Sequence, residues 1–135
     1  MKDYLIDTHA HVDMLEESIE TTIEKLEQFN VKKVVIPSVE VKTLDKVIEL
    51  ADNYENFYAL LGLFPSEVKD YTEELEERFI KLANNPKVVG VGEIGLDYYW
   101  NKSNVEIQKE VFVKQIRLAN TLNLPIVVHD REAHK

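Results

Sequence analysis

The feature that most constrains the fold of this chain is a regular alternation between short β-branched runs and longer stretches with helical periodicity. The short runs predict strands at residues 4–8, 33–37, 57–62, 87–93 and 125–129. The longer stretches, in which apolar residues recur every three or four positions, predict helices at residues 15–30, 43–54, 72–84 and 105–122. Residues 131–135 have the pattern of the first turn of another helix. Because a helix separates each pair of successive strands, the strands are expected to be parallel.

Two α/β architectures fit this alternation: a small open doubly wound sheet and a (β/α)8 barrel. A complete barrel typically needs about 250 residues, whereas this chain has 135. It would therefore supply a truncated portion of a TIM barrel, with about five parallel strands and four helices. The length predicts one domain spanning residues 1–135.

Composition excludes several classes of function. The chain has no cysteine, which excludes disulfide scaffolds, zinc fingers and thiol catalysis. A net charge of -9 argues against a broad basic surface for nucleic acid, although a bound divalent cation could still handle phosphates locally. No apolar run approaches the roughly 20 residues of a membrane helix. No secretory signal is recognisable, so we expect a cytoplasmic protein without membrane partners.

Potential metal ligands cluster where the predicted strands end. His9 and His11 follow the first strand, Glu93 closes the fourth and His129 closes the fifth. The carboxyl ends of parallel strands form one rim, and histidine with carboxylate is a ligand set for divalent ions. Residues two apart in extended chain point to the same side, so His9 and His11 can reach one ion. Asp7 is expected to orient this loop, with ligation as the alternative.

Residues 90–95 match the dinucleotide-binding pattern G-x-G-x-x-G literally, but their context argues against that function. The pattern requires a helix that opens at the glycines, whereas residues 96–100 are predicted to form an irregular loop. The glycines are better explained by close passage of the backbone beside a crowded site. Flanked by small residues, Glu93 suits a carboxylate that bridges two ions, an arrangement typical of metal-assisted hydrolysis.

Aromatic and basic residues are predicted on the rim of this site. Tyr98 begins a run of three aromatic residues, which could stack on nucleobases or cap the core between loop and helix. Arg131 could hold a phosphate in a bidentate grip. Alternatively, Arg131 could pair with Asp130 or Glu132.

Three sequence blocks occur in an order that identifies a family. Residues 6–11 read IDTHAH, residues 92–98 read GEIGLDY and residues 128–133 read VHDREA, with Gln108 and Gln115 in the helix before the last block. Together they resemble the TatD family of metal-dependent deoxyribonucleases. The resemblance implies a barrel of the amidohydrolase type that hydrolyses DNA phosphodiesters with two divalent ions (Mg, Mn or Zn).

The resemblance also implies roles for individual residues. His9 and His11 would bind one ion, His129 would bind the second, and Glu93 would be the catalytic bridging ligand. From their chemistry rather than from the resemblance, Tyr98 and Arg131 are predicted to contact the DNA substrate, single-stranded or at its ends. The family's further histidine and aspartate ligands, after the sixth and eighth strands, have no counterpart here. The resemblance therefore covers the N-terminal half of a family member.

One position departs from the family pattern. Residues 62–65 read GLFP, where family members usually have Gly-x-His-Pro. Phe64 can neither ligate a metal nor donate a hydrogen bond, which puts the substrate contacts at that corner in question.

Two alternatives to a DNA hydrolase remain open. Another hydrolase of the amidohydrolase type could use the same first ligands on an amide, lactone or phosphotriester. Many of those enzymes bridge their ions with a carboxylated lysine, so Glu93 favours the nuclease. A half barrel of this length could instead be inactive alone and self-associate through its open strand edges.

Overall fold

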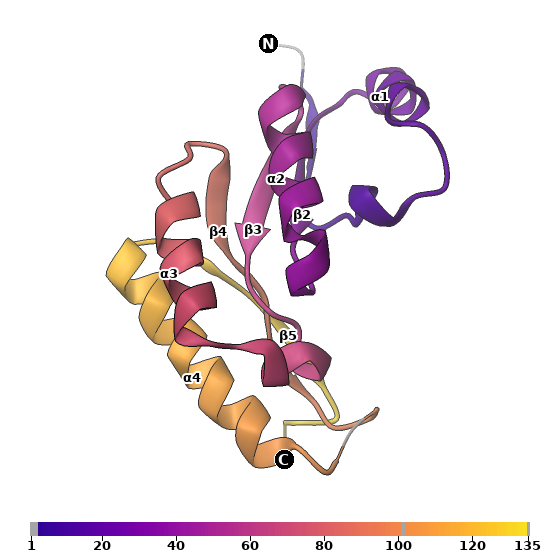
Figure 1. Ribbon diagram of the computed structural model, residues 1–135. Coiled ribbons are helices and arrows are strands. Elements are labelled where there is room, and N and C mark those ends of the chain that lie inside the picture. The colour runs from indigo at the N-terminus through magenta and orange to yellow at the C-terminus, as the bar shows by residue number, and fades with distance from the viewer. Residues whose placement is uncertain (1–2, 101, 135) are drawn as a thin grey trace.

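The computed structural model describes residues 3–100 and 102–134, and its centre is a parallel five-stranded sheet (Figure 1). The strands are β1 (Leu5–Asp7), β2 (Val31–Pro37), β3 (Phe57–Leu61), β4 (Val88–Asp97) and β5 (Ile126–Arg131). They lie side by side in chain order, β1-β2-β3-β4-β5. A doubly wound sheet reverses its strand order partway along, whereas a barrel adds each strand beside the previous one. The order therefore shows a half barrel.

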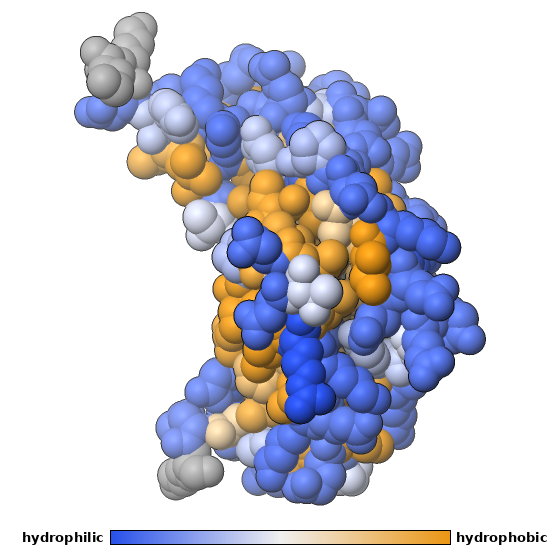
Figure 2. All heavy atoms as spheres, turned by 90° about the vertical axis from the view of Figure 1, so that its left-hand side faces the viewer, coloured by the Kyte–Doolittle hydropathy of each residue, from blue (hydrophilic) through white to orange (hydrophobic). Residues whose placement is uncertain are grey.

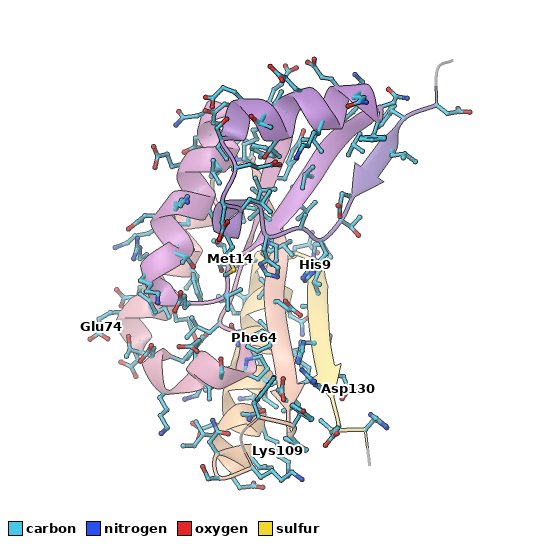
Figure 3. All side chains as sticks on the ribbon, turned by 90° about the vertical axis from the view of Figure 1, so that its right-hand side faces the viewer. His9, Met14, Phe64, Glu74, Lys109 and Asp130 are labelled. Atoms are coloured by element: carbon cyan, nitrogen blue, oxygen red, sulfur yellow. The ribbon has the colours of Figure 1, made fainter. Side chains whose placement is uncertain are left out.

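Four α-helices cover one face of this sheet (Figure 3). They are α1 (Ile19–Gln28), α2 (Leu44–Asn53), α3 (Glu73–Leu82) and α4 (Val105–Leu122), with short 3-10 helices at Val12–Met14, Val41–Thr43 and Pro65–Asp70. The core lies between these helices and the strands, where Phe57, Phe79 and Leu44 are at most 1% exposed. No helix within the described residues has the length and apolar character needed to cross a membrane.

Helix α1 begins later than its periodicity predicts. The Ser18 hydroxyl accepts a hydrogen bond from the Thr21 N–H and caps the helix at that point. Leu15, expected on the apolar face of the helix, lies in extended chain and is exposed. By contrast, α3 begins where the helix of residues 72–84 is predicted to begin, because the Thr72 hydroxyl accepts a hydrogen bond from the Leu75 N–H and caps the helix.

Strands β4 and β5 run further than predicted. Leu96 and Asp97, expected in an irregular loop, belong to β4 because they pair with Asp130 and Arg131 of β5. The helical turn predicted after residue 130 is wrong: Arg131 ends β5, and Glu132 has a positive φ of 56° that interrupts any right-handed helix. Residue 135 lies outside the described residues. No helix opens at the glycines of residues 90–95, since all of them lie in β4 and α4 starts at residue 105.

Gly95 allows this long pairing of β4 with β5. Its φ is +145°, and a Cβ atom placed on it would lie 2.0 Å from the carbonyl oxygen of His129. That oxygen belongs to the backbone of the neighbouring strand, so no side-chain rotation can relieve the clash. Only glycine fits where the two strands approach so closely.

We predict that Gly95→Ala lowers the free energy of unfolding by more than about 3 kcal/mol, because it adds both an overpacked contact and backbone strain. Urea unfolding followed by circular dichroism measures this loss. Gly90→Ala is the comparison variant, since its Cβ atom would lie 2.9 Å from the end of the Leu60 side chain and 3.0 Å from the Pro125 carbonyl oxygen, a much milder contact than the 2.0 Å at Gly95. Gly90→Ala should cost less, and equal losses would contradict the explanation.

Candidate metal centre

The loop after β1 carries both histidines of the first motif and is fixed at two points. The Asp7 carboxylate accepts a hydrogen bond from the His9 backbone N–H at 3.0 Å. The Ala10 N–H donates to the Val35 carbonyl of β2 at 3.1 Å. Asp7 thus contacts the loop backbone, as its predicted orienting role requires, and His9 and His11 are presented at the carboxyl end of the sheet.

Glu93 reaches this loop from β4, where a β-bulge lies between the two pairs Val91↔Ile126 and Ile94↔Val128. Bulges often re-aim a side chain beside an active site. One carboxylate oxygen of Glu93, Oε2, lies 3.1 Å from His9 Nε2 and 3.9 Å from His11 Nε2.

The three side chains His9, His11 and Glu93 fit a divalent metal ion. One ligand atom from each lies within 4.8 Å of the other two, close to the separations of about 3–4 Å that ligands around a single zinc ion adopt. The Nδ1 atom of His11 is buried and has no hydrogen-bond partner within residues 3–100 and 102–134.

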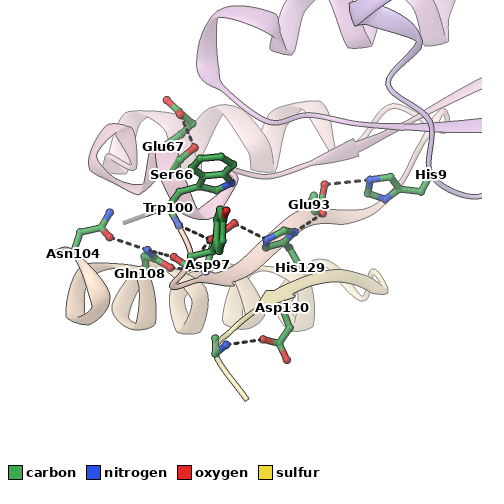
Figure 4. Close-up of polar contacts among 12 residues, drawn as sticks. His9, Ser66, Glu67, Glu93, Asp97, Trp100, Asn104, Gln108, His129 and Asp130 are labelled. Carbon is green, nitrogen blue, oxygen red and sulfur yellow. Dashed lines mark hydrogen bonds and ion pairs between the residues drawn. The ribbon is translucent and has the colours of Figure 1, made fainter. Parts of the chain in front are cut away.

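His129 lies between two carboxylates on β4 (Figure 4). Its Nδ1 atom is 3.1 Å from Oε1 of Glu93, and its Nε2 atom is 3.0 Å from Oδ2 of Asp97. Glu93 therefore directs one oxygen to His9 and His11 and the other to His129. The four residues predicted as ligands lie in one cluster, with the Glu93 carboxylate at its centre.

Asp97 is the residue of this site that sequence reasoning missed, because it was assigned to an irregular loop. It is 3% exposed, and its Oδ1 atom accepts the backbone N–H groups of Tyr99 and Trp100 at 3.0 and 3.2 Å. Burial raises the pKa of this carboxyl, but these hydrogen bonds and the contact with His129 outweigh burial and hold the pKa below its usual range. An aspartate that ends a strand and begins a turn is a recognisable signal for such backbone contacts.

The aromatic rim lies beside Asp97. The Tyr98 N–H donates to the Arg131 carbonyl at 2.9 Å, and the Tyr98 side chain is half-buried. The Arg131 guanidinium lies 3.9 Å from the centre of the Tyr99 ring and 5.3 Å from that of Trp100. Because Tyr99 and Trp100 are 47% and 71% exposed, they do not cap the core.

The alternative ion pairs considered for Arg131 are absent from the part of the chain that the structure describes. Asp130 instead accepts the Ala133 N–H at 3.2 Å and lies 3.6 Å from His134. Arg131 consequently has its guanidinium stacked on an aromatic ring at the edge of the candidate site.

Phe64 changes the corner where the family pattern has histidine. Its ring packs edge-on against the His129 imidazole, with ring centres 4.5 Å apart. Phe64, Ser66, Asp97, Trp100 and Gln108 line a cavity of about 290 Å³. This corner therefore offers apolar contact beside His129.

The comparisons with known proteins agree with the fold and the motifs. The profile of the family described as TatD related DNase matches residues 6–135. The metal-dependent hydrolase YabD of Bacillus subtilis, named as uncharacterized, is 40% identical over 131 residues, which are 96% of this chain and 51% of YabD. The protein named 3'-5' ssDNA/RNA exonuclease TatD in Escherichia coli is 34% identical over 105 residues, which are 78% of this chain and 40% of that protein.

Two solved structures share the fold. The crystal structure of YjjV, a TatD homologue from Escherichia coli, superposes with a TM-score of 0.87 at 34% identity, covering 96% of this chain and 51% of YjjV. A TatD-family hydrolase from Entamoeba histolytica gives a TM-score of 0.85 at 24% identity, covering 98% of this chain and 52% of that one. The chain thus spans about half the length of these relatives. In sequence and in fold, it belongs to the family of TatD-related DNases.

Proposed function

We propose that this chain supplies the metal-binding part of a hydrolase that cleaves DNA phosphodiester bonds with two divalent ions (Mg, Mn or Zn). The observation that carries the proposal is the shared Glu93 carboxylate, with His9 and His11 at one oxygen and His129 at the other. A carboxylate between two sets of histidine nitrogens is the donor arrangement expected of a two-ion site. The names of the relatives as metal-dependent hydrolases support this chemistry.

Each side chain has a distinct role in this proposal. His9 and His11 would hold the first ion, His129 would hold the second, and Glu93 would be the catalytic residue whose carboxylate both ions share. When bound, such ions lower the pKa of a water molecule and stabilise the leaving oxygen. The Asp97 carboxylate accepts a hydrogen bond from the His129 Nε2–H group in this proposal, which leaves the lone pair of Nδ1 directed toward the site.

The substrate is proposed to be single-stranded DNA or a DNA end. The Arg131 guanidinium lies over the Tyr99 ring, 3.9 Å from its centre, and its N–H groups are the donors that would bind a phosphate. Tyr98 adjoins Arg131 through its backbone hydrogen bond and borders the same rim. The exposed Trp100 ring offers a stacking surface for a nucleobase. The exonuclease name of the Escherichia coli relative supports this substrate class.

A second candidate is a hydrolase of the amidohydrolase type that acts on a small amide, lactone or phosphotriester. The observation in its favour is the cavity beside His129, where Phe64 replaces a polar residue with an apolar one. Phe64 and Trp100 in the lining of this cavity suit contact with an apolar group of an uncharged substrate.

The proposed partner of the isolated chain is a second copy of itself. The two edge strands expose large apolar side chains: Leu5 and Ile6 on β1, and Ile126 and Val128 on β5. Figure 2 shows hydrophobic side chains gathered midway along the molecule, between polar ends. An open edge with apolar side chains favours pairing with another strand. Two half barrels of this kind can each cover the other's edges.

For the metal site, we predict that Glu93→Gln and His9→Ala each weaken zinc or manganese binding by at least about 100-fold. A direct ligand should contribute at least as much as the 10–100-fold typical of outer partners. Calorimetric titration of the metal-free protein measures the affinity and the stoichiometry. Glu106→Gln is the matched control, because Glu106 is exposed on α4 and pairs only with Lys109 among the described residues. Unchanged binding by Glu93→Gln would remove the bridging role.

For activity, we predict metal-dependent release of nucleotides from labelled single-stranded DNA by a hybrid of this chain and the remaining half of YjjV. This chain alone should give only background hydrolysis, since half a site lacks ligands. His9→Ala in the hybrid should abolish the activity, and its persistence would refute the assignment. Hydrolysis of small esters or amides with no action on DNA would favour the second candidate.

For self-association, we predict a solution mass near twice the chain mass of 15.7 kDa, measured by light scattering. Val128→Lys places a charge on the exposed edge of β5 and should shift the protein to monomer. Ile80→Lys, at an exposed position of α3, is the control and should leave the mass unchanged. A wild-type monomer at high concentration would contradict the proposal.

A further inference from the structure

Helix α4 carries two glutamines on its buried face, where apolar side chains would ordinarily pack. Gln108 is 0% exposed and Gln115 is 1% exposed. They are seven residues apart, which is about two helical turns, so both point to the same side of the helix. A buried amide is costly unless its donor and acceptor are both hydrogen-bonded. The hydrogen-bond partners of these two amides therefore show which parts of the sheet α4 holds in place.

Each glutamine binds both backbone groups of a single residue at the rim of the sheet. Gln115 Oε1 accepts the Leu63 N–H at 2.8 Å, and its Nε2 donates to the Leu63 carbonyl at 3.2 Å. Gln108 Oε1 accepts the Asp97 N–H at 2.8 Å, and its Nε2 donates to the Asp97 carbonyl at 3.0 Å. A residue on a neighbouring antiparallel strand makes the same pair of hydrogen bonds, one to the N–H and one to the carbonyl. The helix thus fixes two backbone positions, one following β3 and one at the end of β4.

Both of these backbone positions adjoin His129. Asp97 itself lies 3.0 Å from His129 Nε2, and Phe64, the residue after Leu63, packs its ring 4.5 Å from the His129 ring. We propose that Gln108 and Gln115 are positioning residues that hold the His129 imidazole in the orientation required of a metal ligand. The inference deepens the proposed function and depends on it for the role of His129.

The physical reason lies in the two nitrogens of the imidazole. Nδ1 faces Glu93, so metal binding there requires the ring proton to be on Nε2. The Asp97 carboxylate can accept a hydrogen bond from His129 Nε2–H only while the Asp97 backbone stays in place. Gln108 holds the Asp97 backbone through its N–H and carbonyl groups. Gln108 Nε2 also donates to Asn104 Oδ1 at 2.7 Å, which orients the amide. A glutamine on α4 thereby acts on His129 through Asp97, without contact with a substrate.

The test replaces each glutamine with methionine, which has a similar length and no amide. Gln108→Met and Gln115→Met are compared with Gln28→Met, whose residue lies exposed at the end of α1. Nuclear magnetic resonance of the imidazole nitrogens in the metal-free protein reports the Nε2 proton of His129 and its exchange with water. We expect both buried-site variants to shift the His129 signals and speed exchange of this proton, with Gln28→Met unchanged. Signals of His9 and His11 should move less than those of His129.

Metal affinity supplies a second readout. Zinc titration should show a loss for Gln108→Met of at most about 10–100-fold, the range typical of losing the direct partner of a metal-ligating histidine, because Gln108 acts on His129 only through Asp97. A folded Gln108→Met protein with wild-type His129 signals and wild-type exchange would overturn the inference. If that variant fails to fold, Gln115→Met decides by the same criterion. Because the resonance measurement needs neither metal nor substrate, it separates this inference from the proposed function, which fails if His129→Ala leaves zinc binding unchanged.

Discussion

The candidate site depends on one carboxylate, that of Glu93, which lies between the His9 and His11 pair and His129. Glu93 contacts His9 with one oxygen and His129 with the other, across distances of 3.1 Å in both cases. These residues come from three strand ends, so the contact exists only because a parallel sheet brings its carboxyl ends to one rim. The bulge in β4 and the glycine at position 95 let β4 and β5 align there. The pairing of the strands therefore determines the distances between the side chains of the site.

The polar groups of the rim are supported from the helix side. Asp97 is almost fully buried, yet its pKa is held below the usual range by two backbone N–H groups and by His129, despite the opposing effect of burial. Its own backbone is held by Gln108 of α4. A buried polar network stabilises a single arrangement only if its members are satisfied. Helix α4 supplies the hydrogen bonds to the Asp97 backbone, while Val111 and Leu118 of the same helix are buried in the apolar core.

The proposed DNA substrate requires local positive charge on an acidic protein. The net charge of the chain is -9, whereas Arg131 stands at the rim with its guanidinium over an aromatic ring. A nearby positive charge, such as Arg131 or a bound metal ion, dominates the electrostatic potential at the rim, because solvent and salt screen the more distant acidic side chains. The open edges at β1 and β5 raise a separate requirement, since their apolar side chains need cover.

The sequence by itself determined the alternation of strands and helices, the start of α3 at Thr72 and the His-x-His pair, since each depends on neighbouring residues. Its three motif blocks were also sufficient to identify the family. Only the tertiary structure decided that the sheet follows barrel order, that Asp97 binds His129, that Arg131 stacks on Tyr99 and that the α4 glutamines hold the rim. Glu93 and His129 are separated by 36 positions, and no local pattern specifies a contact at that range. Such contacts depend on strand register, which the packing of the complete sheet establishes.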